Sequence, residues 1–142
     1  MKANELRIGN LVKINNELLP ETENEIYKVY GVNAKFDLSF PDSSGVVSLN
    51  HTKSIRIYSQ FDEFINPIPL TEEWLLKFGF EKLTDKKNGF NSNSYTYTKG
   101  ISFIVHLNDK LLSVNFWQGN EKKYVHELQN LFFVLTGEEL TI

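Results

Sequence analysis

A short segment near the middle of the chain, Asn66-Pro67-Ile68-Pro69-Leu70, limits every larger element because it holds two prolines separated by one residue. Proline lacks a backbone N–H and disfavours helix in the residue before it, so neither a helix nor an inner strand crosses this segment. The segment predicts an extended connector. We expect a small β-barrel-like subdomain in residues 1–66 and an α+β subdomain in residues 67–142, either separate or fused into one domain.

Short runs of strand-forming residues dominate the region before the connector. We expect strands in residues 6–15, 25–34, 46–49 and 54–58, the first entered through a turn or bulge at Gly9-Asn10. Gly31 inside the second run predicts a bend or bulge. Short strands at this spacing are typical of a small sheet that is either strongly bent or closed into an SH3-like barrel.

The region after the connector begins with a helix signal. Thr71 is a good N-cap residue, Glu72 and Glu73 suit the positive end of the helix dipole, and Gly79 predicts the helix end. A meander of about four antiparallel strands follows, which we expect in residues 80–84, 95–98, 101–107 and 110–117. Turn residues at Asn88-Gly89 and Asn108-Asp109 separate some of these runs.

The chain closes with a second helix over residues 124–135, which ends at Thr136-Gly137. Helical spacing predicts an inward face made of Tyr124, Leu128, Leu131, Phe132 and Leu135. The same spacing places three polar residues, His126, Gln129 and Asn130, on an outward stripe beside Phe133. The expected fold class is α+β: a small SH3-like bent sheet or barrel, then helix, antiparallel meander and helix.

The sequence contains few of the side-chain patterns that catalysis and metal binding require. It has no cysteine, which excludes disulfides, thiolate metal sites and thiol nucleophiles. Its three histidines, His51, His106 and His126, include no pair spaced for a helical metal site. There is also no Gly-x-Ser-x-Gly elbow, Walker motif or dinucleotide fingerprint. We expect no cofactor and no metal, and we assign no catalytic residue.

Two sets of residues are candidates for binding. Trp117 at a strand end and the stripe of His126, Gln129 and Asn130 form the candidate partner-binding set. The stripe either contacts another protein or ligand, or serves only as the solvated face of the helix or as a tie to neighbouring backbone. An exposed Trp117 marks an interface, whereas a buried one marks only a core.

The second set belongs to a nucleic-acid hypothesis for the first subdomain. Its basic residues are Lys13, Lys28, Lys35, Lys53 and Arg56, with Tyr27, Tyr30 and Tyr58 as stacking groups. The net charge of −3 and the absence of a basic run disfavour this hypothesis, because phosphate binding needs a concentrated positive field. An enzyme with a pocket between the two subdomains is a third hypothesis. The leading one is a non-enzymatic module that binds another protein.

The chain shows no signal for export or for a membrane. Its first ten residues lack the apolar core of a signal peptide, and no apolar run approaches the ~20 residues that span a bilayer. We therefore expect a cytoplasmic protein without a membrane partner.

Four blocks of sequence carry a family resemblance. They are Leu6–Val12, Ile26–Val32, Pro67–Phe80 and Tyr124–Leu140, and the segments Pro-Ile-Pro-Leu-Thr-Glu and Leu-Thr-Gly-Glu-Glu-Leu are distinctive. In this order they resemble an uncharacterised family of small proteins encoded in Bacteroidetes genomes and in their phages and mobile elements. Residues 33–50 are longer and less typical. The resemblance implies a bacterial or phage cytosolic setting, and it brings no known activity or site residue.

Overall fold

The chain forms two units, each built around one sheet. The structure is a computed structural model, and it describes residues 1–33, 45–83, 94–97, 103–106, 111–114, 117–118 and 124–142. The units are Met1–Ile68 and Pro69–Ile142, so the division falls within the proline connector. Both sheets are five-stranded and antiparallel, and the described part of the second unit adds two α-helices. The fold is therefore a mixture of α-helix and antiparallel β-sheet.

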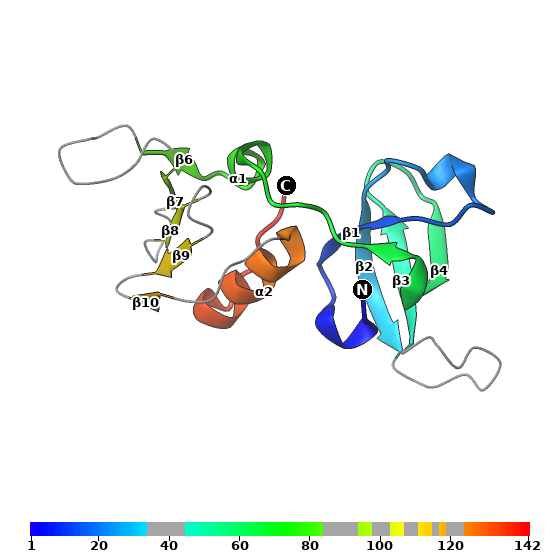
Figure 1. Ribbon diagram of the computed structural model, residues 1–142. Coiled ribbons are helices and arrows are strands. Elements are labelled where there is room, and N and C mark those ends of the chain that lie inside the picture. The colour runs from blue at the N-terminus through cyan, green and yellow to red at the C-terminus, as the bar shows by residue number, and fades with distance from the viewer. Residues whose placement is uncertain (34–44, 84–93, 98–102, 107–110, 115–116, 119–123) are drawn as a thin grey trace. The chain divides into compact units, whose positions relative to one another are not determined.

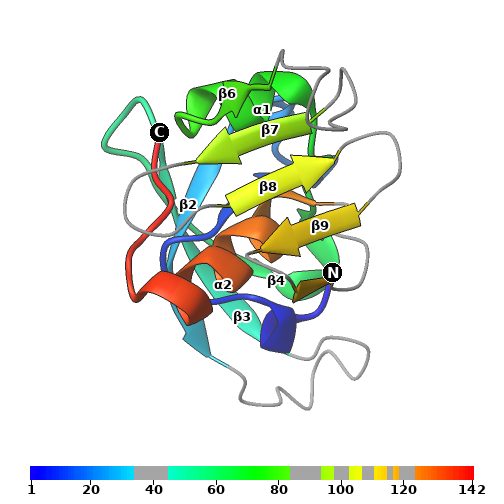
Figure 2. The ribbon, with the colours of Figure 1, turned by 90° about the vertical axis from the view of Figure 1, so that its left-hand side faces the viewer.

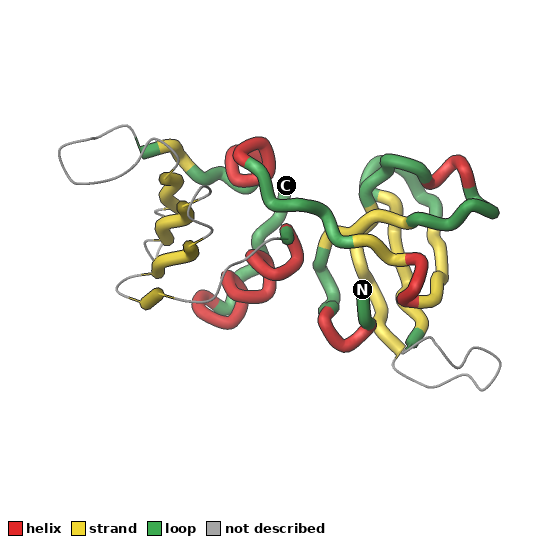
Figure 3. Tube along the Cα trace, in the orientation of Figure 1, coloured by secondary structure: helices red, strands yellow, loops and turns green. Residues whose placement is uncertain are grey.

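The first sheet has the strand order β4-β3-β2-β1-β5 (Figure 1). Its strands are β1 (Leu11–Ile14), β2 (Tyr27–Asn33), β3 (Val46–His51), β4 (Ile57–Phe61) and β5 (Ile65–Asn66). Three short 3₁₀ turns accompany them: η1 (Ala3–Glu5), η2 (Pro20–Thr22) and η3 (Asp62–Phe64), drawn in red among the yellow strands of Figure 3.

This first sheet is open, so of the two predicted forms, a bent sheet or a barrel, the closed barrel is wrong. Within the described residues, β4 and β5 are the outer strands, and neither pairs with the other. The reason lies in β5, which pairs Ile65 with Ile14 and Asn66 with Lys13 and then stops. Pro67 follows directly and offers no N–H for further pairing. Two residues are too few to complete a ring.

The glycines of the first unit lie where the sequence predicted irregular backbone. Gly9 has φ 98°, a conformation that side chains disfavour, and its N–H donates to the Val29 carbonyl at 2.8 Å. The strand expected over residues 6–15 therefore starts only at Leu11. In β2, the pairing register shifts between Val29 and Gly31, which confirms the predicted bulge.

One apolar cluster fills the inner face of the first sheet. Its buried members are Ala3, Leu6, Val12, Ile14, Tyr27, Val29, Val47, Leu49 and Ile65. The N-terminal turn joins this cluster because the Ala3 N–H donates to the buried Asp62 carboxylate at 3.0 Å. That bond ties η1 to η3 and satisfies a carboxylate oxygen that burial removes from water.

The second unit packs two helices on one face of its sheet, as Figures 1 and 2 show. The sheet order is β10-β9-β8-β7-β6. The elements are α1 (Glu72–Lys77), β6 (Glu81–Lys82), β7 (Ser94–Tyr97), β8 (Phe103–His106), β9 (Leu111–Val114), β10 (Trp117–Gln118) and α2 (Val125–Thr136). The meander thus has five strands rather than four, because β9 ends at Val114 and Trp117 begins a separate strand. The predicted turns at residues 88–89 and 108–109 lie outside the described residues.

Both helices end as predicted, and the first also begins at its predicted N-cap, although the capping hydrogen bond is absent. Gly79 and Gly137 follow α1 and α2 with φ 84° and 75°, the left-handed conformation that closes helices. Thr71 occupies the N-cap position of α1, but its side chain makes no capping hydrogen bond. Glu127 does cap α2, since its carboxylate accepts the Tyr124 N–H at 3.1 Å. Among the described residues, no helix is both long enough and apolar enough to cross a bilayer.

Gly137 gives a clean test of backbone strain in the second unit. A Cβ added there meets no atom within 4 Å, so the substitution Gly137→Ala changes the backbone energy alone. We expect a loss of about 1 kcal/mol in the free energy of unfolding, measured by thermal melts followed by circular dichroism. Gly137→Asn, which tolerates the left-handed region better, should lose less. Equal stability of the alanine variant and the wild type would contradict this account.

Candidate interaction surface

The outer strand β4 has an unusual composition for the edge of a sheet. Its residues Ile57-Tyr58-Ser59-Gln60-Phe61 include no charge, no proline and no glycine. The other described edge strands, β5, β6 and β10, have two residues each. Proteins commonly protect their sheet edges by keeping them short, charged or interrupted by proline. Within the described residues, β4 alone lacks all of these protections.

Two backbone hydrogen bonds determine which atoms β4 presents at its free edge. The His51 N–H donates to the Arg56 carbonyl at 2.9 Å, and the Asp62 N–H donates to the Gly45 carbonyl at 3.1 Å. Hydrogen-bonded and non-bonded pairs alternate along an antiparallel ladder. In the register of β3 and β4, Tyr58 therefore directs its N–H and C=O toward β3. Ile57 and Ser59 direct theirs away from the sheet.

Apolar side chains lie next to this free edge. Ile57 is 63% exposed, and Ile55, in the turn between β3 and β4, is 98% exposed. Ile57 pairs with Asn50, which pairs in turn with Lys28, so these three side chains form a row across the outer face. As far as the described strands go, the edge therefore offers both backbone groups outside the ladder and exposed aliphatic surface.

A network around His51 holds the turn that precedes β4. His51 Nε2 lies 3.1 Å from Glu25 Oε2, and His51 Nδ1 lies 2.8 Å from Ser54 Oγ. The Lys53 N–H donates to the same Nδ1 at 3.3 Å, and the Arg56 N–H donates to Ser54 Oγ at 3.4 Å. An amide only donates, so Nδ1 is an acceptor and the neutral ring carries its proton on Nε2, toward Glu25.

The order carboxylate, imidazole, hydroxyl resembles that of a hydrolytic triad, but the local amides serve the turn. Besides a base, catalysis by such a serine needs nearby N–H groups that stabilise the oxyanion of the intermediate. Here the Lys53 and Arg56 amides are directed at His51 and Ser54. The network is therefore best explained as the support of the β3–β4 turn. Sequence reasoning missed it because Glu25 and His51 are 26 positions apart.

Aromatic packing links this network to the core. Tyr27 makes edge-to-face contacts with His51 and with Tyr58, at ring-centroid distances of 5.3 and 5.4 Å. Burial raises the pKa of the Tyr27 phenol to about 12, and Tyr58 and Glu25 add to the effect. Tyr58 is only half-buried, so β4 continues the core outward to the edge.

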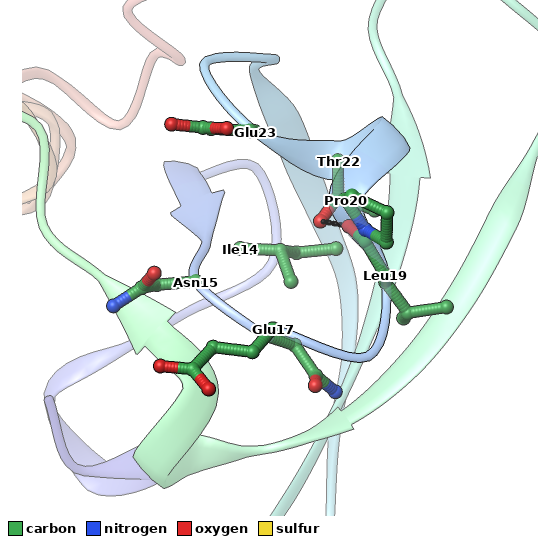
Figure 4. A pocket seen from close by; sticks show the side chains of 8 residues that line it. Ile14, Asn15, Glu17, Leu19, Pro20, Thr22 and Glu23 are labelled. Carbon is green, nitrogen blue, oxygen red and sulfur yellow. Dashed lines mark hydrogen bonds between the residues drawn. The ribbon is translucent and has the colours of Figure 1, made fainter.

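A cavity lies in the loop after β1, apart from the His51 network. It has a volume of about 320 Å³ and is lined by Ile14, Asn15, Asn16, Glu17, Leu19, Pro20, Thr22 and Glu23 (Figure 4). The Thr22 hydroxyl donates to the Leu19 carbonyl at 2.7 Å and closes the loop on itself. Asn16 Nδ2 donates to Gln60 Oε1 at 3.1 Å, which ties this loop to β4. We assign the cavity no ligand.

The second unit has a small polar cluster at the start of α1. Lys82 Nζ lies 3.0 Å from Glu72 Oε1 and 5.6 Å from the ring centroid of the buried Tyr95. The hydrogen bond with Lys82 lowers the pKa of the Glu72 carboxyl, while burial raises the pKa of the Tyr95 phenol. Both shifts favour the ion pair beside a neutral phenol. Within the described residues, no three His, Cys, Asp or Glu side chains are grouped to hold a metal.

The predicted polar stripe on the last helix is largely buried. His126 is 4% exposed and Gln129 is 1% exposed, so their expected outward orientation is wrong, while Asn130 is half-buried. Gln129 Nε2 donates to the Leu140 carbonyl at 3.0 Å, and His126 stacks on the Tyr124 ring at 5.9 Å. Trp117 lies in β10, and its side chain is outside the described residues.

The inward face of this helix also differs from the expected one. Its buried residues are Val125, His126, Leu128, Gln129 and Phe132. Leu135, expected inside, is 40% exposed, and Phe133 and Val134 are exposed beside it. The last turn of α2 therefore carries an apolar surface of its own.

The basic residues of the nucleic-acid hypothesis do not share one face. Lys28 pairs with Leu11, and Lys13 lies two residues after Leu11, so both belong to the outer face. Tyr27 pairs with His51, which is bonded to Arg56, so Arg56 belongs to the opposite face. The sheet thus separates these charges.

Two further facts bear on the same hypothesis. Lys53 is exposed in the β3–β4 turn, whereas Tyr27 is 1% exposed, so its ring cannot stack on a base. Tyr30 is exposed and Tyr58 is half-buried, while Lys35 lies outside the described residues. Nucleic-acid binding stays a prediction, but Tyr27 no longer counts among its three stacking groups.

Comparisons with protein-family models, with curated proteins and with solved structures found no match to this chain. The family resemblance of the four sequence blocks therefore stays a prediction.

The raised pKa of Tyr27 leads us to expect that the stability of the folded chain falls at alkaline pH. The pKa of the Tyr27 phenol is about 12 in the folded chain, whereas its ordinary value, expected in the unfolded chain, is 10.0. The unfolded state therefore releases this proton first as the pH rises. The stability from Tyr27 is fully present below pH 10 and is lost between 10 and about 12. Urea unfolding at several pH values measures this loss.

The substitution Tyr27→Phe should remove that part of the decline, since phenylalanine does not ionise. Tyr30→Phe is the matched control, because Tyr30 is 43% exposed whereas Tyr27 is 1% exposed. Identical alkaline profiles for wild type and Tyr27→Phe would contradict the assignment.

Because Gln129 is buried and bonded to Leu140, we expect a substitution of Gln129 to lower stability and not to act on a binding surface. The substitution Gln129→Met keeps the side-chain length but leaves the Leu140 carbonyl without this donor. We expect a loss of about 1–3 kcal/mol in the free energy of unfolding, from urea titration. Val134→Ala on the exposed side of α2 is the control, and it should change stability by less than about 0.5 kcal/mol. A fully stable Gln129→Met variant would argue against a structural role.

Proposed function

We propose that this chain is a non-enzymatic protein-interaction module of the bacterial or phage cytoplasm, and that it binds partners by adding a strand to β4. The supporting observation is the edge itself: five uncharged residues with outward backbone groups at Ile57 and Ser59. Strand addition supplies affinity through main-chain hydrogen bonds and selectivity through alternate side chains.

We further propose that the first unit is an SH3-like sheet in its connectivity. Four strands follow one another in a meander, the turn η3 comes next, and β5 returns to pair with β1. Small sheets of this kind usually work through their surfaces. The proposed setting in the cytoplasm is supported by the resemblance of the four sequence blocks.

Charge and proline substitutions at the edge test this function. Ile57→Lys adds a charge to the exposed edge, and Ser59→Pro removes an outward N–H that β3 does not use. We expect each variant to weaken partner binding at least about tenfold, or about 1.4 kcal/mol. The measurement is quantitative mass spectrometry of proteins retained by the immobilised chain from a lysate of its host, followed by titration of purified binders.

Ile8→Lys is the matched control, because Ile8 is 62% exposed against 63% for Ile57 and lies outside the sheet. It should retain every binder that the wild type retains. Circular dichroism checks that each variant is folded. Binders lost equally from Ile8→Lys, or retained by both edge variants, would exclude β4 as the binding surface.

A further inference from the structure

The free edge of β4 is nearly self-complementary, and this points to a definite occupant. We propose that β4 pairs antiparallel with β4 of a second copy of this chain, so that two sheets join across a two-fold axis. The inference rests on the proposed function, because it uses the same edge and names its partner. It follows from backbone register, side-chain type and charge.

The backbone determines the register. Ile57 and Ser59 are the β4 residues whose outward groups carry the pairing. An antiparallel copy satisfies both when Ile57 faces Ser59 of the second copy and Ser59 faces its Ile57. Each such pair exchanges two N–H···O=C bonds. The two-fold axis then passes beside Tyr58.

The side chains suit this register. Tyr58 faces its own counterpart in a non-hydrogen-bonded pair, where side chains approach most closely and where aromatic pairs stabilise a sheet. Ile57, 63% exposed in one copy, lies over Ser59 of the other without a charge beside it. The uncharged composition of β4 means that no like charges meet when the strand pairs with itself.

Charges at the two ends of β4 favour the antiparallel direction. The exposed Lys53 and Arg56 precede the strand, whereas the exposed Glu63 follows it; Asp62 is buried, where it accepts the Ala3 N–H. A reversed copy brings the basic end of one strand to the acidic end of the other, and the exposed Lys53 lies toward the exposed Glu63 of the second copy. A parallel partner strand of the same sequence would bring like charges together.

Sedimentation equilibrium over a concentration series tests the inference. We expect the wild type to approach the dimer mass with a Kd below about 1 mM. Ile57→Lys and Ser59→Pro should sediment as monomers, and Ile8→Lys should dimerise like the wild type. A chain that stays monomeric up to about 1 mM overturns the inference, as does a dimer that both edge variants preserve.

Cross-linking gives a second measurement that does not depend on disruptive variants. The chain has no cysteine, so a single Ser59→Cys site reacts alone. A short bismaleimide should join two such chains in high yield, because diagonal neighbours across an antiparallel pair lie about 7–8 Å apart. Ile8→Cys is the control and should stay uncoupled. Equal coupling of both variants overturns the proposed register.

These outcomes separate the inference from the proposed function. In the first case, the wild type is a monomer, and Ile57→Lys loses the other partners. That result overturns the pairing of two copies but supports β4 as a binding surface. In the second case, the wild type dimerises and both edge variants are monomers, but both variants still bind the other partners. That result contradicts the proposed function and supports the pairing of two copies through β4.

Discussion

The hydrogen bond from the His51 amide to the Arg56 carbonyl, 2.9 Å long, sets the phase of the β3–β4 ladder. In an antiparallel pair, side chains and backbone groups both alternate with a period of two residues. This one bond therefore decides that Tyr58 lies toward the core and that Ile57 and Ser59 present their amides outward. A shift by one residue would expose Tyr58 and bury Ile57.

The contacts around that bond keep the phase from slipping. Glu25, Ser54 and the Lys53 amide all contact the His51 ring, and Tyr27 packs against its edge. Lys53 and Ser54 come from the turn after β3, Glu25 from the residues before β2, and Tyr27 from β2 itself. The turn is thus held partly by side chains that lie far from it in the sequence. Beyond them, β4 is positioned by its pairing with β3 and by the hydrogen bond from Asn16 to Gln60.

Local patterns in the sequence were sufficient to predict much of the fold. Alternation, proline and glycine located the connector, the bulge at Gly31 and the ends of both helices. The strand expected over residues 54–58 begins at Ile57 instead, because residues 52–55 form the turn that His51 organises. That network depends on Glu25, a contact that no local pattern encodes. The uncharged run from Ile57 to Phe61 was the available signal for an open edge.

The last helix shows a second limit of sequence patterns. Its final turns, Phe132-Phe133-Val134-Leu135, are apolar all round and give no phase. Polarity then assigned His126 and Gln129 to the outside. The structure buries Gln129 because the Leu140 carbonyl accepts its amide, so a partner later in the chain offsets the cost of burying it. Which polar residue finds such a partner is decided by tertiary structure.

The short β5 strand has a consequence for the size of any assembly. A sheet with two open edges adds copies without limit and grows into a fibre, whereas a sheet with one open edge is complete once that edge is occupied. β5 ends after Asn66 at a proline, so among the strands that the structure describes in the first unit, pairing through β4 leaves no second edge of comparable length. Pro67 therefore limits the growth of the sheet, because it ends the edge at which a further copy would have to pair.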